Sequence, residues 1–391
     1  MRLKRTTLRV ALLGVTAAVL PLVGTGHAAF ADYAPQPGDI VGIGGDTPQY
    51  ALDFLANGDY NGDAGFNSSG AYNRLVPFDA TADGNGRSAY TNSVTTGVPS
   101  VALNPTDVLR AGTVPVQRNQ SSGAGITALL ADTANPEVIN YVASASLPTA
   151  AQQATAFSNG WGYLHVVEIG TDTVDIAADL TATDAPSGLS AAELLGIYTG
   201  TYTTWNQLPG NSAGSTNTIV PLIPPSGSSI YKTFIADLTT ANGGTAPTLS
   251  SAVKTVEQND PTAITGNAHP ADAIVPFSAG RLALWNDGYF HNPATVFPGT
   301  PTPLTPGVKL LNGAPGDGNA VYASPITDYI IFRQSDATST TPAEPGGIRN
   351  WVETLFSNPG GTTPFVAKAG GQALIQAAGI TPNYVDLGDV S

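Results

Sequence analysis

The chain has 391 residues, of which 42% are hydrophobic and only 11% are charged. Its formal net charge of −14 at pH 7 argues against nucleic acids and anionic membrane surfaces as partners. Cysteine is absent, which excludes disulfides, thiolate metal sites and the lipid anchor of a bacterial lipoprotein.

Residues 1–31 have the pattern of a cleavable signal peptide. An apolar run from Val10 to Val23 is too short to span a bilayer, and no acidic residue precedes Asp32. Small residues on both sides of Phe30 predict cleavage after Ala31, with export to the medium, the cell wall or the periplasm. A retained membrane anchor is the alternative, which the flanking Gly and Pro residues disfavour. The basic residues before the apolar run are Arg2, Lys4, Arg5 and Arg9.

Short β-type runs then alternate with amphipathic helical segments, which predicts an α/β fold with largely parallel sheets. Near the C-terminus, Ser324–Arg333 is predicted as a buried strand and Gly347–Phe356 as a helix with one apolar face. Two stretches rich in Gly, Pro, Asn and Asp, Asn57–Arg87 and Asn292–Asn319, are predicted as surface excursions. A mature chain of about 360 residues is expected to form two lobes. The alternating runs are Ile40–Gly44, Gln49–Ala56, Gly125–Ala131, Val138–Ser144, Leu189–Thr199, Ile219–Ile223 and Ser229–Leu238.

Three segments share one design, in which a strand leads through a turn of Gly and hydroxyl residues into the start of a helix. The free N–H groups and the positive dipole end of such helices attract a small oxyanion, and hydroxyl groups add donors. Ordinary helix capping explains each turn equally well, with Asp46 or Thr47 at the N-cap before Pro48. An anion site therefore requires the three starts to converge. The candidate ligand-binding residues are Asp46, Thr47, Ser121, Ser122, Gly123, Ser226, Gly227, Ser228 and Ser229.

These turns, in this order, resemble the phosphate-binding protein of bacterial ABC phosphate transporters, in an actinobacterial-style branch that is not a lipoprotein. The most specific part of the resemblance is Leu189–Gly200 running into Thr204–Leu208. It implies an α/β periplasmic-binding-protein-like fold of type II, with two lobes joined by two crossovers. It also implies a monomer without cofactor or catalysis that holds a small anion, first of all phosphate, between the lobes and has an ABC transporter permease as a partner. We expect lobe one at 32–178 plus 321–391 and lobe two at 179–320.

Two charged positions of the family differ in this chain. The resemblance places the binding arginine of the family on Pro224 and its proton-accepting aspartate near Ala145. Because charge-assisted hydrogen bonds contribute about 1.5–3 kcal/mol each, the sequence predicts weak phosphate binding and poor discrimination against sulfate. Asp46 and Arg118 are candidates to replace the lost charges; the alternatives are a helix cap for Asp46 and a solvated loop position for Arg118. The family contacts carried over by the resemblance fall on Asp46, Thr47, Ser121 and Ser228.

Two other functions stay open on the sequence. One is an extracellular interaction or surface protein that keeps the fold and has lost the ligand. The other is a secreted phosphatase-like hydrolase, although the chain has no Gly-x-Ser-x-Gly motif. Its three mature histidines, His165, His269 and His291, also lack metal-binding spacing.

No metal site is expected. Asp59–Asp63 resembles the beginning of a calcium loop, because its oxygens stand at alternate positions. Ala64 and Gly70, however, stand where that loop requires glycine and a bidentate glutamate, so the segment is predicted as a turn.

Overall fold

The computed structural model describes residues 35–390 with several gaps, and the fold belongs to the unit Ala31–Ser391. The expected signal peptide and its cleavage site lie outside the described residues. None of the helices in the described part of the chain combines the length and apolarity that crossing a membrane requires. The gaps are residue 60, 71–72, 81–105, 115, 120, 135, 288–304, 339–350 and 360.

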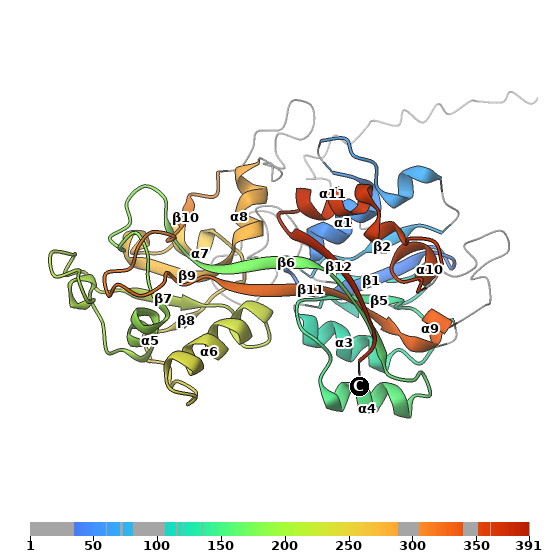
Figure 1. Ribbon diagram of the computed structural model, residues 1–391, viewed down its shortest axis with the longest axis horizontal. Coiled ribbons are helices and arrows are strands. Elements are labelled where there is room, and N and C mark those ends of the chain that lie inside the picture. The colour runs from blue at the N-terminus through green and yellow to red at the C-terminus, as the bar shows by residue number, and fades with distance from the viewer. Residues whose placement is uncertain are drawn as a thin grey trace, which may run out of the picture. The chain divides into compact units, whose positions relative to one another are not determined.

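One ten-stranded mixed sheet organises the fold (Figure 1). Its strands are β1 (Ile40–Gly44), β2 (Leu75–Pro77), β5 (Tyr141–Ser144), β6 (Leu164–Asp179), β7 (Val220–Ile223), β8 (Lys254–Thr255), β9 (Ala273–Ser278), β10 (Val308–Leu310), β11 (Ser324–Arg333) and β12 (Thr381–Asp389). The parallel groups β2-β1-β5 and β9-β7-β8 lie on either side of the antiparallel pair β11 and β6. Strands β10 and β12 also pair with β6. A separate two-stranded sheet consists of β3 (Thr106–Asp107) and β4 (Val116–Gln117).

Helices occupy the connections between the strands, so the predicted α/β fold is confirmed. The expectation of a largely parallel sheet is wrong, because every pairing of β6 and β11 is antiparallel. Strand β11 has the predicted bounds, and α5 begins at Ala191 because Ser190 and Glu193 cap it reciprocally. Of the predicted helix Gly347–Phe356, 351–355 is helical and 347–350 lies outside the described residues. The helices are α1 (Gln49–Asn57), α3 (Ser122–Ala131), α4 (Ala150–Ser158), α5 (Ala191–Thr199), α6 (Ser229–Ala241), α7 (Thr262–Thr265), α8 (Ala279–Asn286), α9 (Gln334–Thr338), α10 (Trp351–Leu355) and α11 (Ala369–Ala377).

The two predicted surface excursions both contribute to the sheet. Strand β2 lies in the first excursion, where its Leu75 is 1% exposed because it pairs in parallel with β1. Strand β10 lies in the second and pairs with β6. The surface prediction is therefore wrong at these strands, and residues 81–87 and 292–304 of the two excursions are outside the described residues.

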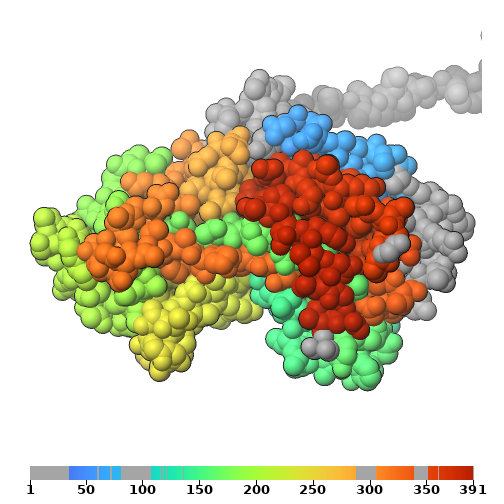
Figure 2. Space-filling model, in the orientation of Figure 1, coloured from blue at the N-terminus to red at the C-terminus, as the bar shows by residue number. Residues whose placement is uncertain are grey.

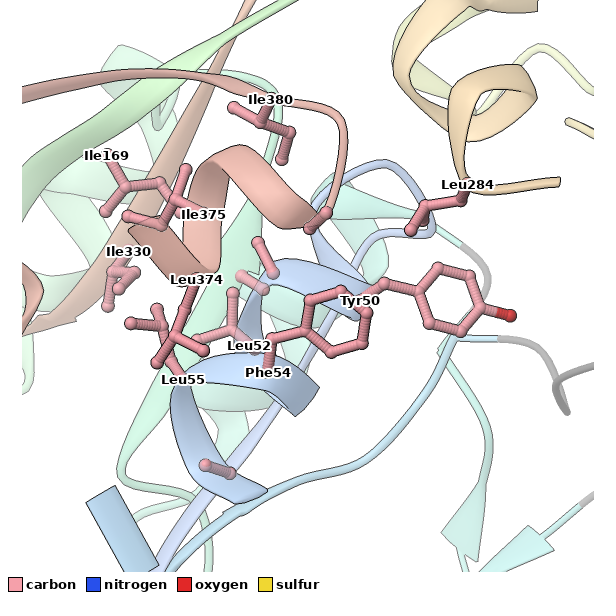
Figure 3. Close-up of a cluster of buried hydrophobic side chains, with 14 of the residues drawn as sticks. Tyr50, Leu52, Phe54, Leu55, Ile169, Leu284, Ile330, Leu374, Ile375 and Ile380 are labelled. Carbon is pink, nitrogen blue, oxygen red and sulfur yellow. The ribbon is translucent and has the colours of Figure 1, made fainter. Parts of the chain in front are cut away.

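A buried apolar cluster fixes α1 against the central strands (Figure 3). Leu52 and Leu55 of α1 pack with Leu374 of α11, and Ile169 of β6 and Ile330 of β11 belong to the same cluster. Each of these side chains is at most 1% exposed. Burial of one such side chain contributes about 1.5–3 kcal/mol. The turn that leads into α1 is therefore held in place by the packing of the helix behind it.

A second cluster fixes α6. The rings of Tyr198 in α5 and Phe234 in α6 pack edge to face, with their centroids 4.7 Å apart. The Tyr198 hydroxyl donates to the Leu222 carbonyl at 2.6 Å. Trp205 is fully buried, and its indole N–H donates to Asp272 at 2.9 Å. The turn before α6 is consequently anchored on β7 and α5.

Asp328, in the middle of β11, is a fully buried carboxyl group. Neither of its carboxyl oxygens has a hydrogen-bond partner among the described residues, and the pairing of β11 with β6 shifts register directly after it. Burial raises the pKa of Asp328 well above its usual range, the neighbouring Asp172 raises it further, and Arg281 lowers it. Asp328 is therefore expected to be protonated in the folded protein at neutral pH.

The substitution Asp328→Asn should stabilise the protein increasingly as pH rises. Because folding raises this pKa, the stability that the protonated carboxyl confers is complete below the unfolded pKa of about 3.9. It is lost as pH rises toward the folded pKa, by up to about 1.4 kcal/mol per pH unit. Asn has nearly the same shape and does not titrate. Melting temperatures measured from pH 4 to pH 8 should diverge in favour of the variant, and a constant difference would contradict the assignment.

Candidate functional site

The first candidate turn, between β1 and α1, does not cap its helix. Pro48 occupies the N-cap of α1, and no side chain there hydrogen-bonds to the helix. The N-cap prediction for Asp46 and Thr47 is therefore wrong. Both side chains instead bond to residues more than 180 positions away in the chain, with Thr47 Oγ1 lying 3.2 Å from Ser229 Oγ.

The second turn contacts the first. Ser121 caps α3 by accepting a hydrogen bond from the backbone N–H of Ala124 at 3.2 Å. Ser122 Oγ accepts from the backbone N–H of Ala145 at 2.9 Å. A Cβ placed on Gly45 would lie only 2.7 Å from Ser122 Oγ, so glycine permits this close approach of the two turns.

The third turn contacts both of the others. Ser228 caps α6 by accepting from the backbone N–H of Tyr231 at 3.1 Å, and Ser229 meets Thr47. A Cβ placed on Gly227 would lie 3.5 Å from Ser121 Oγ. Ser226 and Gly227 are exposed, whereas Ser228 and Ser229 are buried. The structure thus brings the three helix starts together, as the shared design of the turns predicts.

Lys232 supplies a positive charge at this place that sequence reasoning missed. It is the fourth residue of α6, and its Nζ lies 3.7 Å from the position that a Cβ would take on Gly123. Among the described residues no carboxylate forms an ion pair with it. A lysine in the first turns of a helix opposes the helix dipole. The unfavourable position of this lysine at a helix start was the feature of the sequence that could have indicated its role in the site.

Arg281 of α8 was also missed, and it reaches the first turn. Its Nη1 lies 3.3 Å from Asp46 Oδ1, and its Nη2 donates to the Asp46 carbonyl at 2.6 Å. Its guanidinium also lies over the Tyr50 ring, 4.2 Å from the centroid. Strand β9 leads directly into α8 at its N-cap Ser278, so a hydroxyl residue stands at the helix start as in the candidate turns. That shared feature was the signal for this residue.

Two amide side chains complete the surroundings of Asp46. Gln258 Nε2 donates to Asp46 Oδ2 at 3.1 Å, and Asn259 Nδ2 donates to the same oxygen at 2.6 Å. Asn259 has a φ of 55°, a left-handed conformation that asparagine tolerates better than most residues. Its side-chain oxygen accepts from the backbone N–H of Ser278 at 2.9 Å, which links the amide to the start of α8.

The start of α8 is occupied by an internal carboxylate. Asp172 of β6 accepts hydrogen bonds from the Ser278 hydroxyl and from the backbone N–H of Gly280, the latter at 2.9 Å. Burial raises the pKa of Asp172, and these hydrogen bonds act in the opposite direction. The positive end of this helix is therefore neutralised from within the protein.

The structure excludes Arg118 as a solvated loop residue. Its Nη2 lies 2.9 Å from Asp107 Oδ1, and both side chains are at most 4% exposed. The prediction of a solvated position for Arg118 is therefore wrong. The buried guanidinium is paired with the Asp107 carboxylate, because a buried charge without a partner is costly. The charge of Arg118 is engaged there.

Among the described residues, one Ser, His and Asp cluster resembles a hydrolase triad but has the wrong order. Ser357 Oγ donates to Asp386 Oδ2, and His165 Nε2 lies 2.7 Å from Asp386 Oδ1. The carboxylate therefore stands between the hydroxyl and the imidazole, whereas a nucleophilic serine needs the imidazole beside it to take its proton. Hydrogen bonds from His165 and Ser357 outweigh burial and hold the pKa of Asp386 below its usual range.

The fold and the converging helix starts define an α/β protein of the periplasmic-binding-protein type. A family model for the PBP superfamily domain matches residues 79–297, more than half of the 391 residues. The chain therefore belongs to the PBP superfamily. No curated protein sequence matches it.

Several solved structures are similar to this chain at low sequence identity. A putative phosphate ABC transporter substrate-binding protein with bound phosphate from Clostridium perfringens has 12% identity and a TM-score of 0.47, covering 88% of this chain and 99% of its own. A human phosphate binding apolipoprotein has 17% identity and a TM-score of 0.48, covering 88% and 91%. A phosphate binding protein from Stenotrophomonas maltophilia has 15% identity and a TM-score of 0.46, covering 88% and 90%. The family assignment rests on the domain model.

Proposed function

We propose that the protein is a secreted solute-binding protein that holds a small oxyanion, first of all phosphate, where its three helix starts meet. The observation that carries this proposal is the position of Lys232 beside Gly123, next to the starts of α3 and α6. In this proposal the protein catalyses no reaction, acts as a monomer and delivers its ligand to an ABC transporter permease. We propose one lobe at 32–178 plus 321–391 and the other at 179–320.

The donors for the anion come from two helices and their turns. The first N–H groups of α3 and α6 have no partner within their helices, and each helix dipole favours a nearby anion by about 0.3–1 kcal/mol. The Ser121 hydroxyl and the Lys232 ammonium add polar and charged donors. Ser226 and Gly227 are exposed, so solvent reaches this side of the site. Figure 2 shows a hollow in the surface between the segment around α6 (yellow-green to yellow) and the segments of α3 and α4 (teal to green).

Removing the ammonium of Lys232 should weaken phosphate binding. A charge-assisted hydrogen bond contributes about 1.5–3 kcal/mol, so Lys232→Met should raise the Kd for phosphate by roughly tenfold to 150-fold. Isothermal titration calorimetry on the purified mature protein measures this change. Lys368→Met, at an exposed lysine before α11, is the matched control and should bind like the wild type. Equal phosphate affinity of Lys232→Met and Lys368→Met would contradict the placement of the anion beside Lys232.

Phosphate and sulfate should bind with similar affinity. Discrimination against sulfate requires an acceptor for the proton of hydrogen phosphate. The carboxylate of the first turn, Asp46, is engaged by Arg281, Gln258 and Asn259 and does not offer that acceptor. Competition titrations with phosphate and sulfate at pH 7 and pH 8 measure the ratio of the two dissociation constants. Tight binding of phosphate alone would point to an acceptor elsewhere.

Export should produce a mature chain that begins at Asp32. The apolar run of the first 31 residues and the small residues around Phe30 carry this expectation. N-terminal sequencing of the protein recovered from the medium or the periplasm identifies the cleavage site. Recovery of Met1 in a membrane fraction would refute it.

A ligand-free extracellular interaction protein is the second candidate, and one observation favours it. The hydroxyls of Thr47 and Ser229 bond directly to each other, so the first and third turns already satisfy one another. Calorimetry separates the two functions, because the second predicts no heat of binding with either phosphate or sulfate.

A further inference from the structure

The Asp46 carboxylate is held as a bound oxyanion would be held. Arg281 faces one of its oxygens at 3.3 Å, and the amides of Gln258 and Asn259 donate to the other at 3.1 and 2.6 Å. The side chains of Asp46 and Arg281 are each 2% exposed. A guanidinium and two amide donors around a buried carboxylate form the kind of donor set that recognises small carboxylates and phosphates.

The donors and the carboxylate come from different parts of the sheet. Asp46 follows β1, in the parallel group β2-β1-β5. Gln258 and Asn259 follow β8 and Arg281 follows β9, both in the group β9-β7-β8. These contacts therefore connect the two groups at a place other than the central pair β11 and β6.

We propose that Asp46 is a built-in ligand, whose carboxylate fills an oxyanion site formed by Arg281, Gln258 and Asn259 and keeps the two parallel groups closed on each other without a bound solute. The description as closure rests on the proposed two-lobed solute-binding function. The site itself accepts a small planar carboxylate once the Asp46 side chain is shortened.

The donor set distinguishes this role from that of an ordinary surface ion pair. Exposed pairs contribute little, whereas a buried charge left without its partner destabilises strongly. Asp46→Ala leaves the Arg281 guanidinium buried without its carboxylate. Asp46→Ala removes one carboxylate group, and formate is the smallest molecule that supplies such a group. Formate is therefore the probe used.

The first experiment is chemical rescue of Asp46→Ala. The melting temperature should fall by roughly 5 °C or more relative to the wild type. Addition of about 100 mM formate should then restore at least about 2 °C, because a ligand that binds only the folded state stabilises it. Formamide, which has nearly the same size and no charge, should restore nothing, and formate should leave the wild type unchanged.

A double variant locates the rescue at the donor set. Asp46→Ala with Arg281→Met removes both charges, so it should be less destabilised than Asp46→Ala alone. It should also lose the response to formate. An equal response of the single and double variants would overturn the proposal, because formate would then bind elsewhere.

Small-angle X-ray scattering tests closure without depending on any variant. The wild-type radius of gyration should be unchanged by saturating phosphate, and that of Asp46→Ala should be larger and return toward the wild-type value with formate. A wild-type protein that contracts on adding phosphate would overturn the built-in ligand. If calorimetry finds no phosphate binding at all, the proposed function fails, while rescue by formate still decides the role of Asp46.

Discussion

The antiparallel pairing of β6 with β11 is the constraint on which the rest of the structure depends. These two strands contact both parallel groups, so the position of every helix start is set relative to the same pair. The apolar cluster around Ile169 and Ile330 holds α1 on this pair, and the cluster around Tyr198 and Phe234 holds α6. The turns of the candidate site can therefore lie within van der Waals contact although they are far apart in the chain.

The charged groups of the site differ in whether they have partners within the described part of the protein. Arg281 and Asp172 are satisfied within the protein, by Asp46 and by the start of α8. Lys232 has no carboxylate partner among the described residues, and the turns next to it are partly exposed. Burial of an unpaired charge is costly, so the paired groups lie deep and the lysine lies near solvent. In the proposed function, this division favours binding of the anion beside α3 and α6 and not beside Arg281.

Features of the site that depend on neighbouring residues were predictable from the sequence, and features that depend on distant partners were not. Ser121 and Ser228 cap their helices as expected because capping involves residues three positions away. The same rule failed at Asp46, whose partners Gln258 and Arg281 are 212 and 235 residues distant. Strand β2 was missed because a three-residue segment is defined only by its pairing with β1. Family resemblance supplied the order of the turns and did not supply Lys232.

Strand β12 pairs with the first half of β6, and the contacts of Asp386 with His165 and Ser357 fasten it there. One neighbour of the central strand β6 therefore comes from residues 381–389, and the His165–Asp386 contact between the two strands joins residues 221 positions apart. Pairings between segments so far apart in sequence form slowly, because the loop must close before the contacts are made. Completion of the sheet around β6 is therefore expected to be a late step of folding.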